Sequence, residues 1–208
     1  MFKLFKAMLF VMCMSAGFNA YAATVLPISD LGQALNAMSS LQGFSCDFKQ
    51  ELTYAEGGKR EYTGELAVSR PGKFRWHYTK PYEQLYISNG KGVLLYEPDL
   101  MQVQKLDDLG EVDPVVLQLL DGRIGLSDVE VLASKKHEDE MAWHVRIGHE
   151  EQSVDVWLGT KDKHLKWVEI RDVLGNANRL YLLKVVPDVP KDDVFEFIAP
   201  EGVDVIGA

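Results

Sequence analysis

The chain has 208 residues, and its 31 acidic side chains outnumber the 22 basic ones, which gives a formal net charge of -9 at pH 7. This balance argues against a nucleic-acid partner and against loose adsorption to an anionic membrane, since both attract basic surfaces. The length allows a substantial core, and no linker, repeat or low-complexity segment interrupts it, so we predict a single domain.

The N-terminus has the pattern of a signal peptide. Two lysines precede an apolar run from Ala7 to Met14, and Ala20-Tyr21-Ala22 supplies the small residues that a signal peptidase requires. We predict cleavage after Ala22, with a signal peptide over residues 1–22 and the mature domain over residues 23–208. The apolar run is far shorter than the roughly 20 residues that cross a bilayer, so we expect export without stable membrane insertion.

Cleavage would leave Cys46 as the only cysteine, and the mature chain could then form no internal disulfide. This residue stands between Phe44 and Phe48 at the two-residue spacing of one strand face. A lone cysteine in such a setting is typical of a small buried hydrophobe, and we predict that it lies in the core.

The first element of the mature chain is predicted to be an amphipathic helix. Ser29 has the position of an N-cap, and Gly43 follows as a stop signal. The apolar residues at helical spacing are Leu31, Leu35, Met38 and Leu41. The period then changes to two, which predicts a strand with Phe44, Cys46, Phe48 and Leu52 on one face and a second with Tyr62, Gly64, Leu66 and Val68 on one face.

The segment Arg70-Pro71-Gly72-Lys73-Phe74-Arg75-Trp76 combines a turn with a strand. The Pro-Gly pair places Arg70 at the turn, and alternation then puts Phe74, Trp76 and Tyr78 on one strand face. A positive side chain beside an aromatic wall suits a protein that binds an apolar ligand. The simpler interpretation is an exposed arginine at a turn followed by three core aromatics.

A second helix is predicted after residue 112. Asp113 can cap it, and Pro114 fits its first turn. Val116, Leu117 and Leu120 give it an apolar side, and Gly122 ends it.

Further alternating segments follow, at residues 141–147, 154–158, 165–173 and 180–186. About ten to eleven strands in succession are too many for a flat sheet. We therefore predict an α+β fold in which a strongly curved antiparallel sheet or barrel is covered by the apolar faces of the two helices.

Catalytic and metal-binding motifs are absent from the sequence. It contains no G-x-S-x-G elbow, no H-E-x-x-H pair and no phosphate-binding G-x-x-x-x-G-K-[ST] loop. The five histidines share no metal-ligand spacing. We expect a protein that is not an enzyme and that needs no metal or cofactor.

Taken together, an ordered set of short motifs resembles the periplasmic outer-membrane lipoprotein carriers of the LolA type. The set spans nearly the whole mature chain. It comprises residues 44–50, Gly64-Glu65-Leu66, Arg70-Pro71, Phe74-Arg75-Trp76, Pro81, Ser88-Asn89-Gly90-Lys91, Tyr96-Glu97-Pro98-Asp99-Leu100, Gln102-Val103, Asp113-Pro114 with Leu117, Phe195-Glu196-Phe197 and Pro200-Glu201-Gly202-Val203.

This resemblance implies a fold and a role. The fold would be an unclosed β-barrel with a lid of helices over an apolar cavity. The protein would be a monomeric periplasmic carrier that accepts acylated lipoproteins from an inner-membrane ABC transporter. It would shield their acyl chains during transit and deliver them to an outer-membrane receptor.

The resemblance also implies site residues. Arg70 matches the arginine that latches the lid, and Phe74 and Trp76 match aromatic positions near the cavity mouth. Strand alternation adds Leu66, Val68, Leu85, Ile87 and Leu95 as candidates for the cavity wall. The lid helix would contain Pro114, Val116, Leu117 and Leu120.

Alternatives remain open at this stage. Leu94 stands where the family often has tryptophan, Val115 and Val116 stand where bulkier residues are common, and the chain is acidic, so a related carrier of another apolar or acylated ligand is possible. A receptor or lipid sensor of the same fold is a further alternative, although bulky Met12 before Cys13 argues against a lipid anchor. A secreted hydrolase of apolar substrates would have to use Ser69.

Overall fold

The computed structural model describes residues 27–106, 114–137, 139–148 and 153–207. One twelve-stranded sheet contains every described strand, in the order β12-β6-β5-β4-β3-β2-β1-β11-β10-β9-β8-β7. The strands are β1 (Gly43–Thr53), β2 (Lys59–Ser69), β3 (Lys73–Lys80), β4 (Gln84–Asn89), β5 (Val93–Glu97), β6 (Gln102–Leu106), β7 (Val129–His137), β8 (Glu140–Ile147), β9 (Val154–Lys161), β10 (His164–Arg171), β11 (Ala177–Val186) and β12 (Asp204–Ile206).

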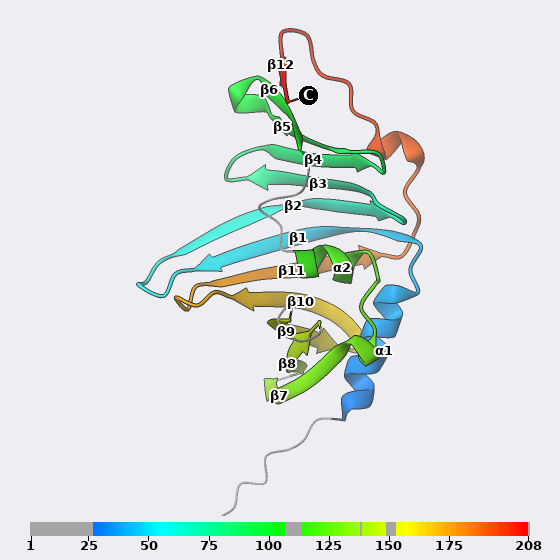
Figure 1. Cartoon of the computed structure of the whole chain (residues 1–208), viewed down its shortest axis with the longest axis vertical. Coiled ribbons are helices and arrows are strands. Elements are labelled where there is room, and N and C mark those ends of the chain that lie inside the picture. The colour runs from blue at the N-terminus through cyan, green and yellow to red at the C-terminus, as the bar shows by residue number, and fades with distance from the viewer. Residues whose placement is uncertain (1–26, 107–113, 138, 149–152, 208) are drawn as a thin grey trace, which may run out of the picture.

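Two α-helices lie on one face of this sheet, α1 (Ile28–Ser39) and α2 (Pro114–Leu120). Figure 1 shows α2 in front of the middle strands and α1 beside the half that ends at β7. The helix α1 packs against β9 and β10 and touches α2. We call the face that the helices cover the inner face, and the opposite face the outer face.

The predicted α+β class, with an unclosed curved sheet and two covering helices, is confirmed. The edge strands β12 and β7 do not pair with each other, so the barrel stays open. The structure has twelve strands where the pattern predicts about ten to eleven, and β12 pairs with β6 in parallel. The additional strand arises because the chain leaves β11 in the middle of the sheet and returns to its far edge (Figure 1).

The inner face carries the hydrophobic core. Its aromatic members are Phe44, Phe48, Trp76, Tyr78, Tyr86 and Trp143 on the sheet, and its helical members are Leu31, Leu35, Met38, Val115, Val116, Leu119 and Leu120. Burial of one large apolar side chain stabilises the fold by about 1.5–3 kcal/mol. The helices are therefore held mainly by these contacts, since helices of 12 and 7 residues are unstable alone.

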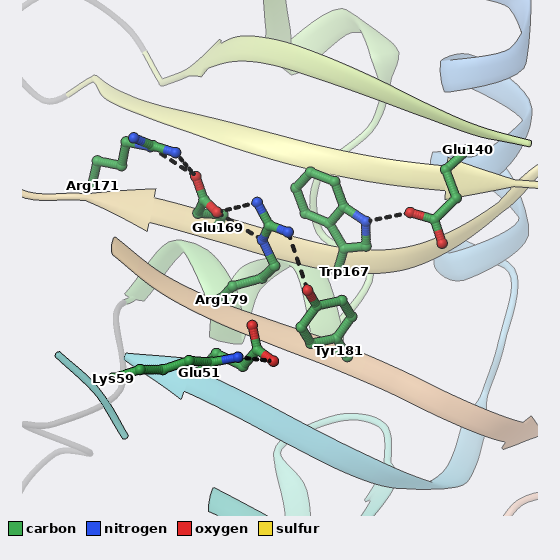
Figure 2. A network of polar contacts seen from close by, with 8 residues as sticks. All are labelled: Glu51, Lys59, Glu140, Trp167, Glu169, Arg171, Arg179 and Tyr181. Atoms are coloured by element: carbon green, nitrogen blue, oxygen red, sulfur yellow. Dashed lines mark hydrogen bonds and ion pairs between the residues drawn. The ribbon is translucent and has the colours of Figure 1, made fainter. Parts of the chain in front are cut away.

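The outer face is polar where no further segment covers it. Figure 2 shows the carboxylate of Glu169, which is buried, between the guanidinium groups of Arg171 and Arg179. Arg171 Nε lies 2.8 Å and Arg179 Nε 2.7 Å from its oxygens. Arg179 also lies 4.3 Å from the ring centroid of Trp167, whose indole donates to Glu140. Because the two faces differ so strongly, a register slip of one residue would exchange them at a high cost.

Several local predictions are corrected. Ser29 does not cap the first helix, which begins at Ile28 after Pro27 without a side-chain cap. The helix ends at Ser39, and Gly43 begins β1 instead of acting as a stop. Gly122 follows α2 with a φ of 70°, as a helix terminator does. Asp113 and the predicted signal peptide lie outside the described residues, so capping and cleavage stay predictions.

Cys46 lies in the inner-face core, as predicted. Burial, assisted by the neighbouring Asp47 carboxylate, raises the pKa of its thiol to about 12. Among the described residues, no helix is long and apolar enough to cross a membrane.

The buried thiol gives a first prediction. Because only the thiolate is nucleophilic, Cys46 in the folded mature protein should not react with a chromogenic disulfide reagent at pH 8, where a thiol with a pKa near 12 is protonated. In urea the same protein should release one equivalent of chromophore within minutes. Rapid, complete reaction of the folded protein would contradict the assignment.

Candidate functional site

Arg70 joins the sheet to both helices. It lies in the turn between β2 and β3, and its backbone N–H donates to the carbonyl of Gln42. Its guanidinium Nε and Nη2 donate to the Leu120 carbonyl at 3.2 and 2.6 Å, and Nη1 donates to the Ser39 carbonyl at 3.1 Å. Nη1 also donates to the carbonyl of Leu41. One side chain thus binds the C-terminal ends of α1 and α2 together.

Helix C-termini suit this guanidinium. The last carbonyls of a helix lack intrahelical donors, and they carry the negative end of the helix dipole. Arg70 supplies several donors in a fixed plane, so it can serve both ends simultaneously. Burial lowers the pKa of the Arg70 guanidinium, and the nearby Asp121 carboxylate opposes that change. The side chain stays charged at neutral pH, because an arginine is not deprotonated in proteins.

Gly122 makes room for the guanidinium. A Cβ atom at this position would lie 2.6 Å from Arg70 Cζ, so any side chain here would have to displace the guanidinium. Its φ of 70° is also in the left-handed region that favours glycine. The residue that ends α2 therefore also allows Arg70 to reach the last carbonyls of that helix.

A small pocket lies under α2, beside the Arg70 contacts. It is lined from the sheet by Leu66, Val68, Gly72, Lys73, Phe74 and Trp76, and from the lid side by Leu117, Leu120, Asp121 and Arg123. Its volume is about 130 Å³, well below the roughly 300–1,000 Å³ of typical ligand pockets. The helices in this state fill most of the space over the inner face.

The structure brings together most of the predicted site residues. Four predicted wall and mouth residues and two predicted lid residues line the pocket, namely Leu66, Val68, Phe74, Trp76, Leu117 and Leu120. Leu95 and Val116 are buried in the same inner-face core. Pro114 is exposed at the start of α2 and does not line the pocket.

The prediction that Leu85 and Ile87 belong to the cavity wall is wrong. Leu85 pairs with His77 and Ile87 with Arg75, which places both on the outer face. The residue between them, Tyr86, lies in the inner-face core. Alternation failed here because both faces of β4 are buried: the segment with Phe195 covers the outer face, and Ile87 and Phe195 line one groove.

Leu94 lines the same outer groove. Its difference from the family pattern therefore does not change the inner face. Ser69, on which the hydrolase alternative depends, is buried at the end of β2, where it pairs with Gly43.

Phe48 and Tyr86 also belong to the aromatic wall, in addition to the residues that the sequence predicts for it. The ring of Phe48 meets Trp76 at 5.7 Å and Tyr78 at 4.9 Å between centroids, both edge to face. Tyr86 extends this group on β4. The two-residue spacing within each strand shows which side chains share a face. It does not show that rings on neighbouring strands are in contact, because that depends on how the strands pair. Val115 and Leu119 on α2 were also missed, because this short helix is apolar almost throughout.

Comparison with known proteins identifies the family. Residues 39–198 match the sequence model of the family described as outer membrane lipoprotein carrier protein LolA. The chain belongs to the LolA family. It is 34% identical over 194 residues to the outer-membrane lipoprotein carrier protein of Methylococcus capsulatus, a match that covers 91% of each chain.

A second LolA relative, the outer-membrane lipoprotein carrier protein of Chromobacterium violaceum, is 29% identical over 201 residues, which cover 95% of this chain and 97% of that one. An uncharacterized conserved protein from Thermus thermophilus has a similar fold, with a TM-score of 0.54, 12% identity and coverage of 86% and 96%. The predicted resemblance and the prediction of a carrier instead of an enzyme are confirmed. No group of three or more potential metal ligands occurs in the part of the LolA chain that the structure describes.

The contact between Gly122 and Arg70 gives a second prediction. In Gly122→Ala the new methyl group should displace the guanidinium, since the end of a flexible side chain moves more easily than backbone. The free energy of unfolding in urea should fall by about 1–3 kcal/mol, from left-handed strain and lost hydrogen bonds. Amide hydrogens of α2 should exchange faster.

Gly125→Ala is the matched control. Gly125 has a φ of -106°, and a Cβ there would meet nothing closer than 3.5 Å. The free energy of unfolding of Gly125→Ala and the exchange rates of its α2 amide hydrogens should stay close to those of the parent. Equal behaviour of the two variants would exclude Gly122 as a support of the Arg70 contacts.

Proposed function

We propose that this protein is the periplasmic carrier of a lipoprotein sorting route. After removal of residues 1–22, the chain of residues 23–208 would accept acylated lipoproteins from an inner-membrane ABC transporter and deliver them to an outer-membrane receptor. The observation that carries the proposal is Arg70, which holds α1 and α2 over an apolar sheet face through hydrogen bonds that can break without unfolding the sheet.

The size of the pocket indicates how cargo would bind. The space under α2 is about 130 Å³, so an acyl chain enters only if the helices move away from the inner face. The apolar side chains of α1 and α2 occupy that face in the closed state. Acyl chains would replace them, so the sheet would keep an apolar partner in both states.

The energetics favour such an exchange. At about 0.8 kcal/mol per buried methylene, an acyl chain of roughly 16 carbons represents on the order of 12 kcal/mol. Complete burial of three chains would exceed the limit of about 20 kcal/mol for non-covalent affinity, and the cargo would never leave. The free energy needed to break the Arg70 contacts and move the helices lowers the net affinity, so the cargo can be passed on.

The same geometry would serve a carrier of another acylated or apolar ligand. A release experiment with cells distinguishes a lipoprotein carrier from a carrier of such another ligand. Purified mature protein is added to spheroplasts with energised inner membranes, and the soluble complexes are identified by mass spectrometry. We expect acylated outer-membrane lipoproteins. Recovery of a folded protein that binds a fluorescent apolar probe but no lipoprotein would contradict the lipoprotein route.

Arg70→Leu tests the latch. Loss of the guanidinium should favour the open lid, so that cargo affinity rises and delivery to receptor-containing liposomes falls by roughly tenfold or more. Arg146→Leu is the control, because Arg146 is an exposed outer-face arginine paired with Asp155. Equal retention and equal delivery by the Arg70 variant and the parent would disprove the latch.

A further inference from the structure

Trp76 carries a buried polar atom without a partner. Its side chain is 3% exposed. Among the described residues, one buried side-chain nitrogen or oxygen atom makes no hydrogen bond, and that atom is Trp76 Nε1. Two other indoles are paired: Trp143 Nε1 donates to Thr160 Oγ1 at 3.0 Å, and Trp167 Nε1 donates to Glu140 at 3.1 Å. Buried donors are almost always satisfied, so the one on Trp76 requires an explanation.

The position of Trp76 suggests that a ligand supplies the acceptor. Trp76 lines the pocket under α2, where its sheet neighbours Leu66, Val68 and Phe74 offer only apolar side chains. Phe48 and Tyr78 pack against the indole and fix its orientation. In the closed state the indole N–H group makes no hydrogen bond, so as a donor it destabilises that state instead of supporting it.

The charges around the pocket restrict the acceptor to a neutral group. An indole N–H donates one hydrogen bond and accepts none. The three cations nearby are paired. Arg70 binds the helix carbonyls, Arg123 pairs with Asp121 at 2.8 Å, and Lys73 pairs with Asp192 at 2.8 Å. A free carboxylate would therefore be placed near Asp121 without a cation of its own. A carbonyl oxygen of an ester meets the donor without this penalty.

We propose that Trp76 Nε1 donates a hydrogen bond to an ester carbonyl of the acyl cargo when the lid opens. The site then selects glycerol-linked acyl esters over hydrocarbon chains that lack a carbonyl. This inference rests on the proposed carrier function, since it concerns the same apolar face. Both the diacylglyceryl group of a lipoprotein and a phospholipid carry such esters.

Matched ligands test the proposal. The ¹⁵N-labelled mature protein is titrated with a diacylglycerol and with its dialkyl ether analogue of equal chain length, and the four indole N–H signals are followed by NMR. The ester should bind about tenfold more tightly, the factor that one hydrogen bond to a buried donor gives. The Trp76 indole proton should shift downfield with the ester and not with the ether.

Variants provide the second arm. Trp76→Phe should bind the ether as the parent does and lose the preference for the ester. Trp157→Phe, which changes a half-buried indole that stacks on His144 on the outer face, should keep that preference. Circular dichroism and urea unfolding verify that both variants fold. If a variant does not fold, the downfield shift of the Trp76 signal in the parent protein still tests the proposal.

The outcomes separate this inference from the carrier function. Equal affinity for ester and ether in the parent, or an unchanged preference in Trp76→Phe, would overturn the role of Trp76 even if spheroplasts still release lipoproteins. Failure of both ligands and of lipoprotein release would overturn the carrier function and this inference with it. A diacylated lipopeptide that shifts the indole signal at lower concentration than a phosphatidylcholine of equal chain length would assign the ester to lipoprotein cargo.

Discussion

One arginine, Arg70, fixes the ends of the two helices that pack on the apolar sheet face. A twelve-stranded sheet with an apolar inner face would expose that face to water, and the short helices that cover it have no independent stability. Arg70 supplies the polar contacts that hold these helices in place, at the point where their carbonyls need donors. Burial costs this charge part of its hydration, so the contact is weaker than its number of hydrogen bonds alone suggests.

The difference between the two sheet faces complements this contact. On the outer face, buried Glu169 is neutralised by Arg171 and Arg179, and aromatic rings pack under cations. This part of the outer face is therefore polar without a covering segment (Figure 2), whereas the part at β4 is covered by the segment around Phe195. On the inner face the corresponding polar contacts are neutral, from Tyr78 to Gln50 and from Gln50 to Asn178, and its many apolar side chains must contact either the helices or a ligand. Exchange between those two partners is the physical basis of the proposed carrier cycle.

The sequence predicts more about the sheet than about its surroundings. Two-residue alternation correctly placed Phe48, Leu66 and Trp76 on one face, because each of those strands is buried mainly on that side. It misplaced Leu85 and Ile87, because β4 is also covered by the distant segment around Phe195, and no local pattern reports that contact. Family motifs identified Arg70, but its contact with Gly122 becomes visible only in the folded chain, because the two residues are 52 positions apart.

The most direct test of the account is the distance between α2 and the sheet in solution. Spin labels on exposed Gln118 and Lys80, in a Cys46→Ala background, report that distance by pulsed electron spin resonance. We expect one narrow distance distribution without cargo and a longer distance with bound acyl cargo. We also expect the longer distance for Arg70→Leu without cargo. The same distribution in all three samples would contradict a lid that Arg70 closes.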